Sequence, residues 1–268
     1  MEDNRMSVDD VFLYEGGEIP AGIGLKITRV RIDPRVTEIP SRKFWFLPIQ
    51  TFKGWGRQLA EVKFEDGALQ VIGDYAFNGC ALQEVAIPSS VTKLGACAFF
   101  NCIRLAEVQL NEGLQIIGEH AFSECWALQQ VVIPSSVTDF GQNAFHSCRS
   151  LANVQFNEGL QIIGGAAFCR CIALQQVTIP STVTELGQYA FAHCINLAEV
   201  QLNEGLQIIG KSAFCDCKAL QQVTIPSTVT KVDESTFRGC SNLASVRSAR
   251  DLGTLLTAHF EAARRCEA

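Results

Sequence analysis

The run LAEVQLNEGLQIIG, Leu105–Gly118, returns without any change at Leu197–Gly210. A third copy, LANVQFNEGLQIIG at Leu151–Gly164, differs from the other two only at Asn153 and Phe156. The three copies begin at intervals of 46 residues. A phrase that recurs at a fixed interval of this size is the signature of a fold built from stacked units. Because a repeated phrase carries few unique residues, we do not expect a unique pocket.

The repeating unit is half of that interval. Nine leucines follow one another at steps of 23 residues: Leu59, Leu82, Leu105, Leu128, Leu151, Leu174, Leu197, Leu220 and Leu243. Eight phenylalanines, defined here as the register phenylalanines, keep the same step after a first one of 22 residues: Phe77, Phe99, Phe122, Phe145, Phe168, Phe191, Phe214 and Phe237. One unit reads L-x-x-V-x-[LIF]-[NP]-x-x-[VL]-x-x-[LIF]-G-x-x-A-F-x-x-C. So short a unit cannot bury its own apolar side, so the units must stack.

Each unit predicts a closed coil. The stretch LQQVTIP, residues 174–180, alternates apolar and polar side chains as a β-strand does. VTELG, residues 183–187, gives a second, shorter extended side that ends at a glycine. QYAFAHC, residues 188–194, spaces its apolar residues by one turn, which favours a short helical or 3-10 turn. We therefore expect an α/β repeat solenoid: a right-handed stack of coils about 4.8 Å apart, with a parallel β-sheet face and helical or 3-10 turns opposite.

The unit resembles the BspA-like class of leucine-rich repeats, whose units end in A-F-x-x-C or A-F-x-x-N and carry I-P after the strand. The resemblance covers roughly residues 27–246. Ordinary leucine-rich repeats, L-x-x-L-x-L-x-x-N, match less well, because Asn111 directly follows Leu110. The opening VFLYEGGEIP, residues 11–20, also looks like the leading segment of large expansions of this family in algae and other microbial eukaryotes. The resemblance implies a leucine-rich-repeat coil stack that is used for protein binding or adhesion, without catalysis.

Four segments are expected along the chain. They are a disordered N-terminus at 1–10, an N-terminal cap with an incomplete first coil at 11–51, about eight coils of 22–23 residues at 52–246, and a C-terminal cap helix at 247–268. The aromatic residues Phe44, Trp45 and Phe46 stand in an insertion of the first coil. We interpret this insertion as a cover for the open edge of the stack, with an aromatic docking patch as the alternative.

Composition and charge narrow the class of partner. The chain has 268 residues, of which 47% are hydrophobic and 19% charged, and its formal net charge is −6. This is an ordinary globular balance, and an acidic chain lacks the positive field that nucleic acid or an anionic membrane would need. The first ten residues are polar and acidic, so no secretory signal is expected, and no run reaches the ~18 apolar residues of a membrane span. If the chain is complete, we expect a cytoplasmic or other intracellular reducing compartment.

Most of the cysteines occupy one register of the repeat, and we call these eight the register cysteines: Cys80, Cys102, Cys125, Cys148, Cys171, Cys194, Cys217 and Cys240. We interpret them as free thiols that fill the core. Neighbours in register would point the same way about 5 Å apart, which suits neither a disulfide nor a tetrahedral zinc site. Replacing Cys148 by serine is expected to cost on the order of 1–3 kcal/mol if the hydroxyl finds no partner.

No catalytic residue, cofactor or metal site is predicted. The histidines do not share a register, and no phosphate-binding loop or catalytic motif is present. Cys169 and Cys215 form C-x-C pairs with register cysteines, and we interpret them as exposed, incidental thiols. Glu112, Glu158 and Glu204 recur every second coil and predict a solvated turn rather than a calcium site, since consecutive ligands would lie two coils apart.

The candidate binding surface is the outward side of the predicted strands, which we call the strand face. Its residues are Glu61, Lys63, Glu84, Glu107, Gln109, Gln130, Asn153, Gln155, Gln176, Thr178, Glu199, Gln201, Gln222 and Thr224, with Ala86 and Val132 between them. They form a neutral-to-acidic surface rich in amides. Repeat solenoids use such extended surfaces for binding.

These observations favour a non-enzymatic, monomeric protein-interaction scaffold that binds a protein partner on the strand face. The alternative is a structural or assembly spacer that is held through its aromatic N-terminal end, at Phe44, Trp45 and Phe46. Neither nucleic acid nor a membrane is expected as a partner.

Overall fold

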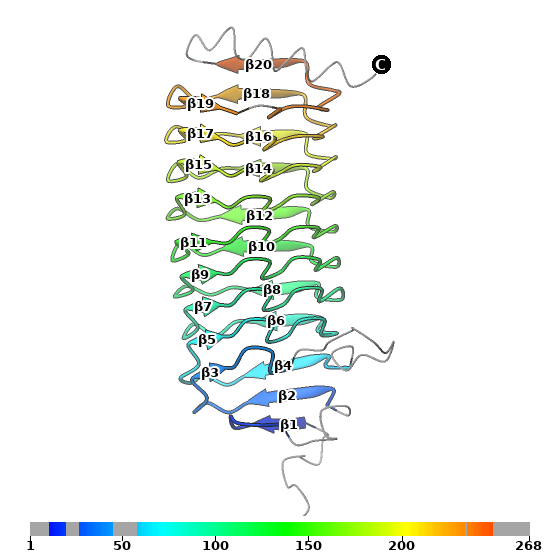
Figure 1. Ribbon diagram of the computed structural model, residues 1–268, viewed down its shortest axis with the longest axis vertical. Coiled ribbons are helices and arrows are strands. Elements are labelled where there is room, and N and C mark those ends of the chain that lie inside the picture. Colours follow the sequence, from blue (N-terminus) through cyan, green and yellow to red (C-terminus); the bar gives the residue numbers. More distant parts are fainter. Residues whose placement is uncertain (1–10, 20–26, 45–57, 234, 249–268) are drawn as a thin grey trace, which may run out of the picture.

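The computed structural model describes residues 11–19, 27–44, 58–233 and 235–248. These residues form one stack of coils with a long strand on one side and a short strand on another (Figure 1). The long strands are β1 (Val11–Tyr14), β2 (Arg29–Ile32), β4 (Glu61–Phe64), β6 (Glu84–Ala86), β8 (Glu107–Gln109), β10 (Gln130–Ile133), β12 (Asn153–Phe156), β14 (Gln176–Thr178), β16 (Glu199–Gln201), β18 (Gln222–Ile225) and β20 (Ser245–Ser248). The short strands are β3 (Glu38–Ile39), β5 (Val71–Ile72), β7 (Lys93–Leu94), β9 (Ile116–Ile117), β11 (Asp139–Phe140), β13 (Ile162–Ile163), β15 (Glu185–Leu186), β17 (Ile208–Ile209) and β19 (Lys231–Val232).

The predicted stacking of the coils is confirmed. The strand pairs are parallel, and the partners lie one coil apart in the sequence, as in Val177↔Val200 and Leu186↔Ile209. Within each long strand the residues point alternately inward and outward, so β14 and β16 each have the pattern exposed, buried, exposed. The leucine and phenylalanine series of the repeat lie in one continuous core.

The expectation of an α/β solenoid with helical or 3-10 turns opposite the strand face is wrong for the described residues, which contain strands and turns but no helix. In their place, each coil makes successive tight turns that contain two residues with positive φ, such as Tyr189 at 57° and His193 at 59°. Alternate backbone N–H groups of these turns donate to carbonyl oxygens of the next coil. Tyr189 N–H donates to Lys211 O and Phe191 N–H donates to Ala213 O, both at 2.8 Å. A helix would keep these hydrogen bonds within one segment, whereas here they tie neighbouring coils together. Positive φ costs a non-glycine residue about 1–2 kcal/mol, and the inter-coil hydrogen bonds offset that cost.

A column of stacked aromatic rings runs through the core. It begins with Phe44 and continues through the eight register phenylalanines, with successive ring centroids 5.2–5.8 Å apart and ring planes within 13° of parallel. Phe44 therefore belongs to the stack, and Tyr14 covers its edge at 5.4 Å. The rest of the aromatic insertion, with Trp45 and Phe46, lies outside the described residues, as do residues 1–10 and residues 249–268 of the predicted cap helix.

The register cysteines line the column and are all buried free thiols. Each thiol donates a hydrogen bond to the carbonyl oxygen of the column phenylalanine in the preceding coil. For example, Cys148 Sγ lies 3.2 Å from Phe122 O, and Cys194 Sγ lies 3.2 Å from Phe168 O. The cysteine is therefore more than a small apolar filler, because it supplies a donor to a buried carbonyl.

The sheet of long strands is interrupted twice, between β4 and β6 and between β12 and β14. Each interruption follows a coil with phenylalanine, Phe64 or Phe156, at the position where the coils between them and the next three coils carry isoleucine or leucine. The sheet of short strands is interrupted between β11 and β13, and there Phe140 replaces the Ile, Leu or Val of the other coils. A phenyl ring takes more room than an aliphatic side chain, and a close-packed interior absorbs it by small shifts of the backbone. We attribute the three interruptions to these three rings.

Candidate functional site

The predicted strand-face residues lie together on one surface of the stack. All fourteen are exposed except Glu61, which is half-buried. They form two rows that cross the strands. One row contains Gln130, Asn153, Gln176 and Glu199, and the second contains Val132, Gln155, Thr178 and Gln201. Neighbours on hydrogen-bonded strands stand about 4.8 Å apart within a row, and both rows are interrupted between β12 and β14, which are not paired.

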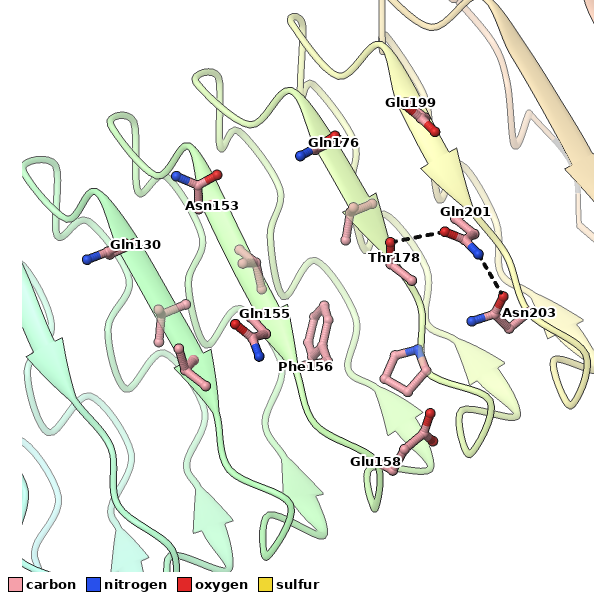
Figure 2. A pocket seen from close by; sticks show the side chains of 15 residues that line it. Gln130, Asn153, Gln155, Phe156, Glu158, Gln176, Thr178, Glu199, Gln201 and Asn203 are labelled. Carbon is pink, nitrogen blue, oxygen red and sulfur yellow. Dashed lines mark hydrogen bonds between the residues drawn. The ribbon is translucent and has the colours of Figure 1, made fainter.

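A groove of about 560 Å³ lies on the strand face where the sheet is interrupted between β12 and β14. Figure 2 shows its side chains, which come from the four strands β10, β12, β14 and β16 and from the turns that follow them. We call it the central groove, and it is lined by Gln130, Val131, Val132, Asn153, Val154, Gln155, Phe156, Glu158, Gln176, Val177, Thr178, Pro180, Glu199, Gln201 and Asn203. The groove is open and lined by amides, unlike the enclosed apolar cavities that hold small molecules.

The amides on the two sides of the groove differ in their hydrogen bonding. Gln201 accepts from Thr178 Oγ1 and donates to Asn203 Oδ1, both at 3.4 Å (Figure 2). Within the described part of the chain, the carboxamides of Asn153 and Gln155 make no hydrogen bond to the protein. Each of them therefore presents a donor and an acceptor to a ligand.

A second groove, of about 570 Å³, follows the other interruption of the sheet and lies at β4, β6 and β8. We call it the acidic groove, and its charged lining residues are Glu61, Lys63, Glu65, Asp66, Glu84 and Glu107. Lys63 is paired with Glu61 at 2.9 Å, and Glu65 with Arg31 at 3.2 Å. Glu84 and Glu107 are adjacent partners on neighbouring strands without an ion pair among the described residues. This end of the strand face therefore carries an uncompensated negative charge.

The sequence predicted the face but missed the grooves. We expected no unique pocket because the phrase is repeated, yet the central groove lies at the one copy that departs from it, through Asn153 and Phe156. Seven lining residues were absent from the predicted surface: Val131, Val154, Phe156, Glu158, Val177, Pro180 and Asn203. The substitutions at Asn153 and Phe156 mark the position of the central groove in the sequence. The groove itself could not be predicted from them, because they act through the spacing between coils.

The recurring glutamates have a structural role that their spacing did not reveal, and we call Glu112, Glu158 and Glu204 the clamp glutamates. Each accepts hydrogen bonds from two backbone N–H groups and one hydroxyl of the next coil. Glu112 accepts from Ser135 N–H at 3.1 Å, Ser135 Oγ at 3.0 Å and Ser136 N–H at 3.2 Å. Hydrogen bonds from the Ser135 and Ser136 backbones lower the pKa of Glu112 below its ordinary value, since they stabilise the charged form.

The remaining candidates stay apart from the strand face. Cys169 is buried and Cys215 only half-buried, so the expectation of exposed thiols is wrong for both. Within the described residues, no three of the His, Cys, Asp and Glu side chains gather in a group that could hold a metal ion. In the same residues no helix is long and apolar enough to cross a membrane.

Comparison with known proteins identifies the repeat. Residues 70–195 and 161–265 match the family described as BspA type Leucine rich repeat region, with six copies. The crystal structure of the T. pallidum leucine-rich repeat protein TpLRR is 34% identical, with a TM-score of 0.54 over 59% of this chain and 74% of that one. The pneumococcal vaccine antigen PcpA is 21% identical and shares the fold, with a TM-score of 0.55 over 90% of this chain and 66% of that one. No curated protein matches the chain.

Proposed function

The chain belongs to the BspA-type leucine-rich repeat family, and from this premise we propose that it is a non-enzymatic scaffold that binds a protein partner on the strand face. Proteins with such repeats are commonly interaction scaffolds, because a stack of coils presents one long, rigid surface. The residues proposed to make the contact are those of the strand face, from Glu61 to Thr224.

The observation that carries this proposal is the pair of exposed carboxamides on β12. Asn153 and Gln155 are held on this strand above a packed core, yet their polar groups have no partner within the described protein. A rigid backbone fixes where these groups stand, so a partner pays little to order them. The negative charge of the acidic groove adds a preference for a partner that is not itself acidic.

We also propose that the protein works in a reducing compartment. The eleven cysteines of the described residues are free thiols, and the eight register cysteines lie buried in the core of the stack. Thiols persist where the cell keeps them reduced.

The test compares two sets of three Gln→Glu changes in the same three coils. The first set is Gln109→Glu, Gln155→Glu and Gln201→Glu on the strand face. The matched control places the same charges on the side of the short strands, at three exposed positions of the repeated phrase: Gln115, Gln161 and Gln207. Exposed changes usually alter the free energy of unfolding by about 0.5 kcal/mol or less, so both variants should remain folded.

Affinity capture from native lysate, followed by quantitative mass spectrometry, gives the readout. We expect a partner of the unchanged protein to be lost with the strand-face variant and retained with the control. Retention of that partner by the strand-face variant, together with its loss on Trp45→Ala, would refute the proposal and support attachment through the N-terminal end.

A further inference from the structure

We propose that the central groove is the specificity site of the strand face and that it holds an extended peptide segment by one apolar anchor residue, with a basic residue three to four positions away. This inference rests on the proposed function and adds to it the place of contact and the chemistry of the partner.

The central groove lies at the coil whose sequence departs from the repeated phrase, and the structure shows how the two substituted residues change the packing there. Asn153 and Phe156 are the two departures from a phrase that is otherwise identical in three coils. Phe156 turns its ring edge-to-face against Phe168, at 5.5 Å and 88°, and the sheet is interrupted immediately after its strand. Asn153 replaces a glutamate of the sister coils, so the same coil loses a negative charge where the sheet opens.

The floor of the groove is apolar and incompletely covered. Val154 and Phe156 are only half-buried, whereas the equivalent valines of the two sister coils, Val108 and Val200, are 6% and 7% exposed. Val132 beside them is 46% exposed, although the coil before it and the four after it carry Gln or Thr at this position. These three side chains form a small apolar patch within a ring of amides, which suits one aliphatic or aromatic side chain of a partner.

The shape and polarity of the groove fit an extended backbone. Its lining spans four neighbouring strands, a distance of about 14 Å along the stack at the usual strand spacing. An extended chain rises about 3.3 Å per residue, so roughly four residues cover that length. Asn153, Gln155 and Gln176 offer carboxamides, which can pair with both the N–H and the C=O of such a chain.

The glutamates near the central groove determine where a basic residue of the bound peptide would lie. Within the lining of the central groove the ionisable groups are Glu158 and Glu199, and Glu158 is engaged as a clamp. On the other side of Asn153, Glu107 lies two coils away and Glu84 three coils away. These separations are about 10 and 14 Å, or three to four residues of extended chain. Since these two glutamates lie side by side without a cation of their own, a lysine or arginine of the partner relieves their repulsion.

The sister coils supply a variant that is certain to be compatible with the fold. Asn153→Glu combined with Phe156→Leu restores the phrase of Leu105–Gly118 and Leu197–Gly210. The matched control is Gln161→Glu combined with Ile162→Leu, which makes one equal charge change and one aliphatic exchange at exposed positions of the same coil, away from the strand face.

The probe is a library of random peptides displayed on phage, selected on the unchanged protein, with the enriched sequences synthesised and their affinities measured by fluorescence polarisation. We expect the enriched peptides to share an apolar residue with Lys or Arg three or four positions away. Their affinity should fall at least about tenfold on the restored-phrase variant, as for loss of an anchor pocket, and should stay within about twofold on the control.

Enrichment of no peptide, or of peptides that bind the restored-phrase variant within about twofold of the unchanged protein, would overturn the inference. A third variant, the strand-face Gln→Glu triple, then separates the two claims. If peptides ignore the restored phrase but are lost on the triple variant, the strand face still binds and only the groove assignment fails. If they bind both variants unchanged, the proposed function fails as well.

Discussion

Replacing Cys148 tests whether the register cysteines act as hydrogen-bond donors or only as apolar filler. The Cys148 thiol is fully buried, and its sulfur donates to Phe122 O at 3.2 Å. Phe122 O also accepts from Cys125 N–H at 3.3 Å, so loss of the thiol leaves the carbonyl weakened but not bare.

Two contributions add up when Cys148 becomes alanine. Removal of the sulfur leaves a small void in a close-packed column, which costs about 1–1.5 kcal/mol. Loss of a weak donor to a carbonyl that keeps one partner costs about 0.5–1 kcal/mol. We therefore expect Cys148→Ala to lower the free energy of unfolding by about 2 kcal/mol. Cys148→Ser should lose only about 1 kcal/mol, because the hydroxyl can donate to the same carbonyl. The 1–3 kcal/mol expected from the sequence assumed that no partner is present, and the structure supplies one.

Equilibrium unfolding in urea, followed by circular dichroism, measures both variants against the unchanged protein. If the dependence of the free energy of unfolding on urea is the same in both variants, the shifts of their urea midpoints show which variant is less stable. If the alanine variant is as stable as the serine variant, or more stable, the thiol contributes only volume and the reasoning is refuted.

Three further outcomes follow from the same structure. Ala166 has a φ of 52°, whereas its neighbour Ala167 is buried and has a negative φ. Ala166→Gly should therefore raise the free energy of unfolding by about 0.5–1 kcal/mol, and Ala167→Gly should lower it by about 1 kcal/mol. If urea unfolding finds the Ala167→Gly variant more stable than the Ala166→Gly variant, the assignment of strain to Ala166 is contradicted. Changing the three clamp glutamates to glutamine should lower the melting temperature at pH 7. Because folding lowers the pKa of each glutamate below its ordinary value of 4.5, the difference in melting temperature should be complete above pH 4.5 and should vanish as the pH falls through the folded pKa. A difference that persists at low pH would rule out the charge as its cause. Burial raises the pKa of Cys102 to about 12 and also raises the pKa of its register neighbour Cys125. The register cysteines should therefore react slowly with a thiol reagent in the native protein and completely after unfolding. Disulfides between neighbouring register cysteines, detected by intact-mass measurement, would be the contrary result.

The stacked coils, their register and their core could be predicted because each rests on a spacing that is visible in the chain. The leucine and phenylalanine series mark inward positions directly, and the structure buries them. The turns opposite the strand face could not be predicted from spacing. Ala190, Phe191 and Cys194 lie inside whether the segment is a helix or a pair of tight turns. What separates the two is the sign of φ at Tyr189 and His193, and residues of these types carry no local preference for positive φ strong enough to be read.

The candidate site divides in the same way. The strand face follows from alternation within each strand, which is a local property. The grooves depend on contacts between residues 12 or 13 positions apart, because Phe156 packs against Phe168 and Phe64 packs against Phe77 beside the two interruptions of the sheet. The clamp glutamates likewise act on the following coil. Repetition hides such effects, since each partner is itself part of the pattern.

The clamps also make the number of coils a quantity that genetic recombination can change. Each clamp glutamate stands in one coil of a 46-residue pair and its serine or threonine partners stand in the next, so the joint is carried whole within the pair. An unequal exchange between Leu105 and Leu197, for example, would delete two pairs and leave every remaining glutamate facing the hydroxyl and amides it needs. The shortened protein would lose the only copy of Asn153 and Phe156 while keeping its fold. A change of length in steps of 46 residues therefore preserves every remaining clamp, whereas the central groove is kept only where the coil with Asn153 and Phe156 is kept.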